Sequence, residues 1–96
     1  MLYALICTDK PDALQIRLDN RPAHLEFLKG LGDALKAAGP FLDDGGNMTG
    51  SMLIIEASNR DEILAISQED PYARADLFEH VDIRPWNWAI KNPEAS

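Results

Sequence analysis

Residues 2–8 read LYALICT and residues 50–57 read GSMLIIEA, two apolar runs of the length that is typical of β-strands. The first run ends at the turn residues Asp9-Lys10-Pro11. The turn sequence DGGN at residues 44–47 separates the second run from residues 41–43, so these two segments predict a β-hairpin. Residues 78–86 alternate apolar and polar side chains and predict a last strand.

The spacing of apolar residues between the first strand and the hairpin predicts a helix over residues 22–38. Its stripe recurs every three or four residues and consists of His24, Leu28, Leu31, Leu35 and Ala38. Gly39-Pro40 is expected to end this helix, because glycine and then proline commonly follow a last helical turn. Gly30 and Gly32 lie inside it, and each costs about 1 kcal/mol of helix stability relative to alanine.

Two further segments have helical signals. Residues 12–18 are expected to form a short helical turn, with a kink or restart near Arg21, because Pro22 disfavours the helical conformation of the residue before it. Asn59, followed three residues later by Glu62, predicts the N-cap of a second helix. This helix is expected to end before Pro71, in a structured loop over residues 70–76.

The order of these elements is βαββαβ, which predicts the α+β ferredoxin-like fold, with an antiparallel sheet and both helices on one face. We expect one domain over residues 1–96, with residues 87–96 as a polar C-terminal tail. The strands are apolar on both faces, whereas the helices can cover only one. The sequence therefore predicts a homodimer that packs sheet to sheet, and a monomer with its tail folded over the sheet is the alternative.

Composition excludes several classes of partner. The chain has 96 residues and a net charge of -7, so we expect it to bind neither nucleic acid nor an anionic membrane. No apolar run approaches the ~20 residues that span a bilayer. The single cysteine cannot form an internal disulfide, which favours a cytoplasmic location.

His24 and Asp70 are the two candidates for catalytic residues. An unperturbed histidine titrates near pH 6.5, so His24 is suited to general acid–base chemistry, although a buried imidazole bound to a backbone carbonyl is an alternative interpretation. Asp70 precedes Pro71, which is also typical of an Asx turn. The ferredoxin-like fold can bring the two residues to the same end of the sheet, where the carboxylate would orient the imidazole.

Three other residues are candidates for substrate binding. Arg21 lies one helical turn before His24 and is able to hold a carboxylate or phenolate, although it is equally typical of a surface arginine. Tyr72 is able to line a pocket, although an aromatic residue is more typical of a core or a dimer interface. Ser51 follows a glycine at a strand start, which the hairpin by itself also explains. Cys7, His24 and His80 lack metal-ligand spacing, so we expect neither a metal nor another cofactor.

The sequence resembles the YCII-related (YciI-like) family over nearly its whole length, from Met1 to Trp86. The motifs that carry the resemblance are RPAHL at 21–25, AGPFL at 38–42, GSMLIIE at 50–56, DPY at 70–72 and, beyond Phe78, IRPW at 83–86. This resemblance implies a ferredoxin-like fold that dimerises through its sheets into an α+β barrel. It also implies a small-molecule site built on a His-Asp pair, here His24 and Asp70.

Relatives in this family include a dehydrochlorinase, and related folds include proton-shifting isomerases and cofactor-free monooxygenases. The leading hypothesis is therefore a cofactor-independent enzyme that eliminates or isomerises a small cyclic or aromatic metabolite by proton transfer. The competing hypothesis is a non-catalytic protein that binds a small molecule or serves as an accessory subunit. A structural, dimeric stress or regulatory subunit is a third interpretation.

Overall fold

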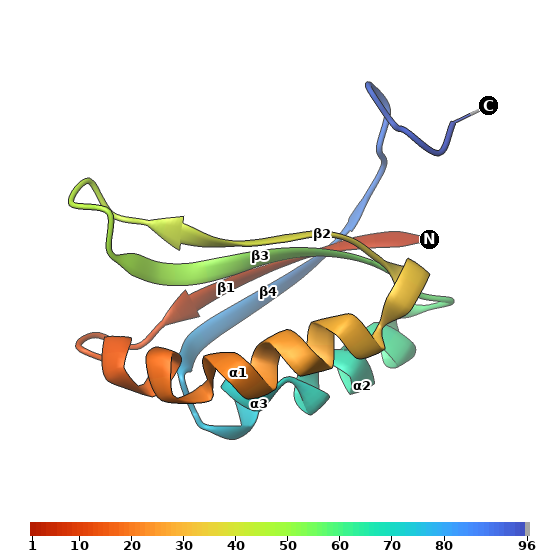
Figure 1. The fold of residues 1–96 in the computed structure, drawn as a ribbon. Coiled ribbons are helices and arrows are strands. Elements are labelled where there is room, and N and C mark those ends of the chain that lie inside the picture. Colours follow the sequence, from red (N-terminus) through yellow and green to blue (C-terminus); the bar gives the residue numbers. More distant parts are fainter. Residues whose placement is uncertain (96) are drawn as a thin grey trace.

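The molecule consists of two layers, a four-stranded antiparallel sheet and a layer of helices on one of its faces (Figure 1). The computed structural model describes residues 1–95. Within them, the elements follow in the order β1 (Leu2–Asp9), α1 (Leu14–Gly30), the single 3₁₀ turn η1 (Gly32–Ala34), β2 (Leu35–Leu42), β3 (Met48–Glu56), α2 (Arg60–Glu69), α3 (Pro71–Arg74) and β4 (Phe78–Trp86). The strand order β2-β3-β1-β4 confirms the predicted α+β ferredoxin-like fold.

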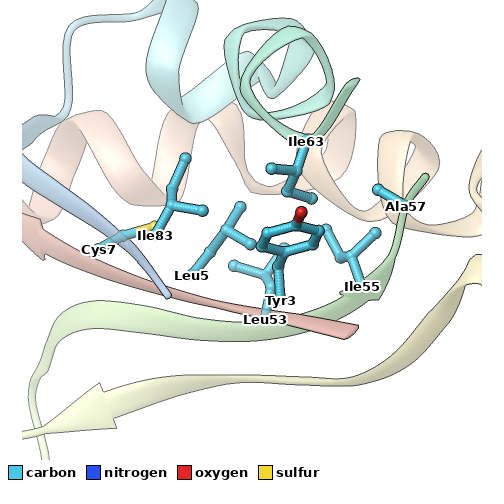
Figure 2. Close-up of a cluster of buried hydrophobic side chains, with 8 residues drawn as sticks. All are labelled: Tyr3, Leu5, Cys7, Leu53, Ile55, Ala57, Ile63 and Ile83. Atoms are coloured by element: carbon cyan, nitrogen blue, oxygen red, sulfur yellow. The ribbon is translucent and has the colours of Figure 1, made fainter. Parts of the chain in front are cut away.

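The central strand β1 pairs with β3 on one side and β4 on the other, so Leu5 lies opposite both Leu53 and Ile83. These three side chains face the helices, because alternate residues of a strand point to the same face. Figure 2 shows the apolar cluster that results between the sheet and α2, which consists of Tyr3, Leu5, Cys7, Leu53, Ile55, Ala57, Ile63 and Ile83. The strands predicted from the two apolar runs and from residues 78–86 are therefore confirmed.

The predicted helix over residues 22–38 is wrong at both ends. α1 begins at Leu14 and passes through Pro22 without a break near Arg21. Proline removes one hydrogen bond to the carbonyl four residues earlier. Here Pro22 and Leu18 both lie on the exposed side of the helix, where water can solvate that carbonyl, so the helix continues.

The same helix ends at Gly30, eight residues before the predicted end. Gly32 has a φ of +57°, a left-handed conformation that terminates a helix and that glycine adopts readily. Residues 35–42 then form β2, although the sequence predicted a strand only at residues 41–43. β2 is an edge strand of the sheet, which tolerates the proline at position 40.

The segment around Asp70 is more regular than the predicted loop. Asn59 caps α2 as predicted, since its Oδ1 accepts a hydrogen bond from the amide of Glu62 at 2.9 Å. The helix ends at Glu69, and the short helix α3 follows at once, with Asp70 as its N-cap and Pro71 as its first residue. Asp70 is therefore fixed between two helices.

The sheet face opposite the helices carries a shallow hollow. It is lined mostly by apolar residues: Ala4, Ile6, Ala37, Met52, Ile54, Arg84, Pro85, Trp86 and Trp88. In Figure 1, the chain after β4 rises away from the sheet on the side opposite the helices. Within residues 1–95, no helix combines the length and the hydropathy that crossing a membrane requires.

Candidate functional site

A cavity of about 160 Å³ lies between α1 and the β2–β3 edge of the sheet. Its lining comes from α1, β2, β3 and α3 and consists of Arg17, Arg21, His24, Leu25, Leu28, Ala38, Gly39, Pro40, Met48, Ser51, Leu53 and Tyr72. Four of the five candidate residues from the sequence, all except Asp70, contribute to this lining. The volume is sufficient for a small ligand of the size of a single ring.

His24, which lines this cavity, is in contact with Asp70. The Nδ1 atom of His24 lies 2.8 Å from Oδ1 of Asp70, although the two residues are 46 positions apart in the sequence. Both side chains are buried. The same carboxylate oxygen accepts a hydrogen bond from the amide of Tyr72 at 3.0 Å, which is the capping contact of α3. Asp70 thus makes the local turn that its sequence indicated and also contacts His24.

The other ring nitrogen of His24, Nε2, has no hydrogen-bond partner within residues 1–95. Every fully buried side-chain nitrogen or oxygen of these residues has a hydrogen-bond partner. Nε2 has none, so it is not fully buried, and it is accessible to a molecule in the cavity that His24 lines. The imidazole is therefore held at one nitrogen and open at the other. The alternative interpretation, a histidine bound to a backbone carbonyl, does not describe this contact.

The ring of Tyr72 stacks on the imidazole of His24, with centroids 3.9 Å apart and planes inclined by 14°. The guanidinium carbon of Arg17 lies 4.6 Å from the centroid of the same ring. Two groups cannot occupy one face of a ring, so Tyr72 is sandwiched between Arg17 and His24. The two flanking residues are seven positions apart on α1. This is about two helical turns, or about 10 Å along the helix axis in total, which leaves room for the ring between them.

Arg17 is the centre of a buried polar network that was not among the sites predicted from the sequence. It contacts Asp9 in a bidentate manner, with Nε 2.7 Å from Oδ2 and Nη2 2.8 Å from Oδ1. Nη2 also donates to Oγ of Ser51 at 2.9 Å. Burial by itself lowers the pKa of the Arg17 guanidinium, but the carboxylate of Asp9 outweighs it and holds this pKa above its ordinary value.

A periodic signal for Arg17 exists in the sequence, because residues 17, 21 and 24 share one face of a continuous helix. The predicted kink near Arg21 concealed this signal, since a kink separates residue 17 from the helix that carries His24. For the second member, Asp9, the sequence predicts only a place in the turn after the first strand. Their pairing depends on how α1 packs on the sheet, which the sequence does not encode locally.

Arg21 differs from Arg17 in its surroundings. It lines the cavity but is exposed to solvent, and no carboxylate of residues 1–95 forms an ion pair with it. Burial raises the pKa of the Tyr72 hydroxyl, while the charges of Arg17 and Arg21 act in the opposite direction. The cavity therefore contains one cationic side chain whose charge is not neutralised by a neighbouring carboxylate.

The remaining reactive side chains do not form a site of their own. Cys7 is buried in the apolar cluster, and burial, assisted by the negative charge of Asp70, raises the pKa of its thiol to about 12. A thiol with this pKa is a poor nucleophile at neutral pH. Within residues 1–95, no group of three or more histidine, cysteine or acidic side chains is arranged to hold a metal ion.

Comparison with known proteins connects this geometry to a family. The profile of the YCII-related domain matches residues 1–87. Protein YciI of Escherichia coli O6:H1 is 39% identical over 94 residues, which cover 90% of this chain and 96% of that protein. An uncharacterised protein of Haemophilus influenzae is 32% identical over 94 residues, with the same coverage of both chains.

A solved structure is similar as well. It is 5-chloro-2-hydroxyhydroquinone dehydrochlorinase from Burkholderia phenoliruptrix AC1100 in complex with 2,5-dihydroxybenzoquinone. This structure is 37% identical to the present chain with a TM-score of 0.84, and the match covers 91% of this chain and 94% of that one. Profile, sequence relatives and structure agree over nearly the whole length, and the chain therefore belongs to the YCII-related family.

Proposed function

We propose that this protein is a cofactor-independent enzyme that transfers a proton on a small cyclic or aromatic metabolite, with His24 as the acid–base residue. The observation that carries the proposal is the contact of 2.8 Å between Nδ1 of His24 and Asp70, which leaves Nε2 open to the cavity. The similarity to a dehydrochlorinase bound to a dihydroxybenzoquinone supports the choice of a ring compound.

The contact with Asp70 favours one tautomer of the imidazole. A carboxylate only accepts hydrogen bonds, and Oδ1 of Asp70 already accepts one from the amide of Tyr72. The hydrogen in the contact with His24 is therefore assigned to Nδ1. Nε2 then presents a lone pair to the cavity, which is the form that a general base requires, and Asp70 stabilises the imidazolium after proton transfer.

The cavity has side chains that suit an acidic ring substrate. Arg21 supplies a positive charge for a phenolate or enolate oxygen, Ser51 supplies a hydroxyl group, and Tyr72 supplies part of the wall. In an elimination from the keto tautomer of a hydroxylated ring, Nε2 takes a proton from a hydroxyl group or an sp³ ring carbon. The electron pair of that bond forms a C=O or C=C double bond, and the conjugated electrons expel the leaving group from its own sp³ carbon. In an isomerisation, the same nitrogen returns the proton to another atom of the ring. Arg21 stabilises the negative charge that develops in either case.

The test is turnover of 5-chloro-2-hydroxyhydroquinone, the compound named for the similar structure, followed through release of chloride. His24→Gln keeps a hydrogen-bonding group near Asp70 but has no basic nitrogen, and we expect it to lower kcat about 10²–10⁴-fold. Asp70→Asn is expected to lower kcat because it removes the charge that fixes the tautomer. His80→Gln and Asp61→Asn are matched controls, since both residues are exposed and neither lines the cavity.

Wild-type turnover by both site variants would reject the acid–base roles. The competing function, a non-catalytic small-molecule-binding or accessory protein, predicts that 2,5-dihydroxybenzoquinone binds in the cavity while no tested ring compound turns over. Isothermal titration with this quinone, repeated with His24→Gln, separates the two functions. If the quinone binds while no compound of a panel of halogenated hydroquinones and lactones is turned over, the non-catalytic function is favoured.

We also propose that two copies pack through the sheet face opposite the helices. Ala4, Met52, Ile54 and Trp86 face this side, and apolar faces of this kind are rarely left in water by monomers. The cavity with His24 lies on the other side of the sheet, so a sheet-to-sheet dimer leaves it accessible. Sedimentation is expected to give about twice the chain mass of 10.7 kDa, and Met52→Glu is expected to shift it to the monomer. A wild-type monomer at micromolar concentration would contradict this proposal.

A further inference from the structure

We propose that Arg17 is a positioning residue of this site: it holds the Tyr72 ring against His24 and directs the hydroxyl proton of Ser51 into the cavity toward a ligand oxygen. The second part of this inference rests on the proposed small-molecule site, whereas the first concerns the protein without a ligand. Arg17 itself does not act on the substrate, because its charge is already paired with Asp9.

The orientation of the Arg17 guanidinium is fixed by three hydrogen bonds. Two of them, at 2.7 Å and 2.8 Å, go to the two carboxylate oxygens of Asp9, and the third, at 2.9 Å, goes to Oγ of Ser51. Arg17 is 2% exposed, so its plane cannot rotate without breaking buried contacts. This planar, bidentate geometry is specific to arginine, since a lysine ammonium is a single point donor.

The contact with Arg17 determines where the hydroxyl proton of Ser51 points. A guanidinium has no acceptor, so Oγ of Ser51 must accept in this hydrogen bond and its own hydrogen must point elsewhere. Within residues 1–95, this hydroxyl has no acceptor, and Ser51 lines the cavity. The donor is therefore available to a ligand oxygen. A hydrogen bond from a cationic donor also polarises the hydroxyl and strengthens the bond that it donates.

The contact with Tyr72 determines how the imidazole is supported. The guanidinium carbon lies 4.6 Å from the centre of one face of the ring, and His24 stacks on the other face at 3.9 Å. Removal of the guanidinium leaves one side of the ring without a neighbour, so the tyrosine and the imidazole gain freedom. The hydrogen bond from Nδ1 to Asp70 then loses part of its geometric constraint.

Arg17→Lys is the informative variant, because it keeps a positive charge beside Asp9 and so avoids an unpaired buried carboxylate. The single ammonium of lysine cannot replace the bidentate contact with Asp9, the hydrogen bond to Ser51 and the stacking on Tyr72 at the same time. Arg60→Lys is the matched control. Arg60 also makes a side-chain hydrogen bond, from Nη1 to the carbonyl of Ile83 at 3.1 Å, and it does not line the cavity.

The first experiment records long-range ¹H–¹⁵N spectra of the His24 imidazole in the absence of ligand. In the wild type and in Arg60→Lys we expect one tautomer, with the hydrogen on Nδ1. In Arg17→Lys we expect a mixture of the two tautomers of His24. An unchanged single tautomer in a folded Arg17→Lys protein would overturn the positioning of His24, whether or not the protein is an enzyme.

The second experiment is a double-mutant cycle with 2,5-dihydroxybenzoquinone as the probe. Ser51→Ala is expected to weaken binding about tenfold in the wild type, the typical loss of one polarised hydrogen bond, and less than twofold in Arg17→Lys. The same tenfold loss in both backgrounds would overturn the role of Arg17 at Ser51. Absence of quinone binding by the wild type would reject both this donor role and the proposed ligand class, and the imidazole spectra would still decide the role of Arg17 at His24.

Discussion

The helix-covered side of the sheet contains two buried regions of opposite chemistry. Between the sheet and α2, the apolar cluster of Figure 2 includes Leu5, Ile55 and Ile63, which are almost fully buried. Between the sheet and α1, the equally buried side chains are charged or polar, and the buried residues of α1 are Arg17 and His24. One layer of packing thus combines an apolar core with a polar network around a cavity.

The difference separates a region that stability alone explains from one that it does not. Burial of an aliphatic side chain contributes about 1.5–3 kcal/mol to the free energy of folding, so stability alone explains the apolar cluster. A buried ion pair seldom stabilises more than well-packed apolar residues of the same size would. The network of Asp9, Arg17 and Ser51 is therefore not explained by stability. Its position beside the cavity favours a functional reason, and four measurements sharpen or contradict this distinction.

The largest effect is expected from leaving one charge of the polar network unpaired. Arg17→Leu strands the buried carboxylate of Asp9 and is expected to lower the free energy of unfolding by about 3–5 kcal/mol. The double variant Asp9→Leu/Arg17→Leu is expected to recover most of this loss. Urea unfolding of both proteins measures the difference. A double variant as unstable as the single one would mean that the ion pair contributes to stability after all.

A substitution in the apolar cluster is expected to change stability alone. Ile55 is fully buried, and Ile55→Ala is expected to lower the free energy of unfolding by about 2–5 kcal/mol, with Ile55→Val at about 0.5–1.5 kcal/mol. Because Ile55 does not line the His24 cavity, quinone binding by the folded fraction is expected to change less than twofold. A loss of binding larger than the unfolded fraction would show that the two regions are coupled.

Cys7 lies at the border between the two regions, and its thiol is expected to make the free energy of unfolding depend on pH. Burial and the charge of Asp70 raise the pKa of Cys7 from 9.0 to about 12, so the unfolded chain releases this proton at lower pH than the folded protein. The associated stability is complete below pH 9 and is lost as the pH rises toward 12. The slope is at most about 1.4 kcal/mol per pH unit.

Tyr72 also has a raised pKa and acts with the same sign, so the comparison with Cys7→Ala isolates the thiol. Urea midpoints at pH 8.5, 9.5 and 10.5 are expected to fall more steeply in the wild type than in the variant. Parallel curves would contradict burial of a protonated thiol at this border.

The smallest effect is expected outside both regions, at the cap of α2. Asn59→Ala removes the hydrogen bond to the amide of Glu62 and is expected to lower the free energy of unfolding by about 1 kcal/mol, as helix caps do. Ser58→Ala, one residue earlier, is the control, because its exposed hydroxyl makes no cap contact. Equal effects of the two substitutions would place the origin of the loss in the loop rather than in the cap.

Local patterns in the sequence were sufficient for much of the fold. The strands β1, β3 and β4 and the cap of α2 were predicted because alternation, apolar runs and capping residues act over a few positions. α1 and β2 were predicted wrongly because a helical period continued across Gly30 and Gly32, and because Pro22 was expected to break a helix whose exposed side tolerates it. The cytoplasmic location and the single domain over residues 1–96 remain predictions.

The sequence by itself determined which chemical groups are available and the order of the elements that carry them. His24, Asp70, Arg21, Ser51 and Tyr72 were selected from residue type, spacing and family resemblance, and their roles remain predictions. Only the tertiary structure decided which groups meet. The contacts from His24 to Asp70 and from Arg17 to Ser51 span 46 and 34 residues, and they depend on the packing of α1 against the sheet. Contacts of this range follow from packing of whole elements, so no local pattern contains them.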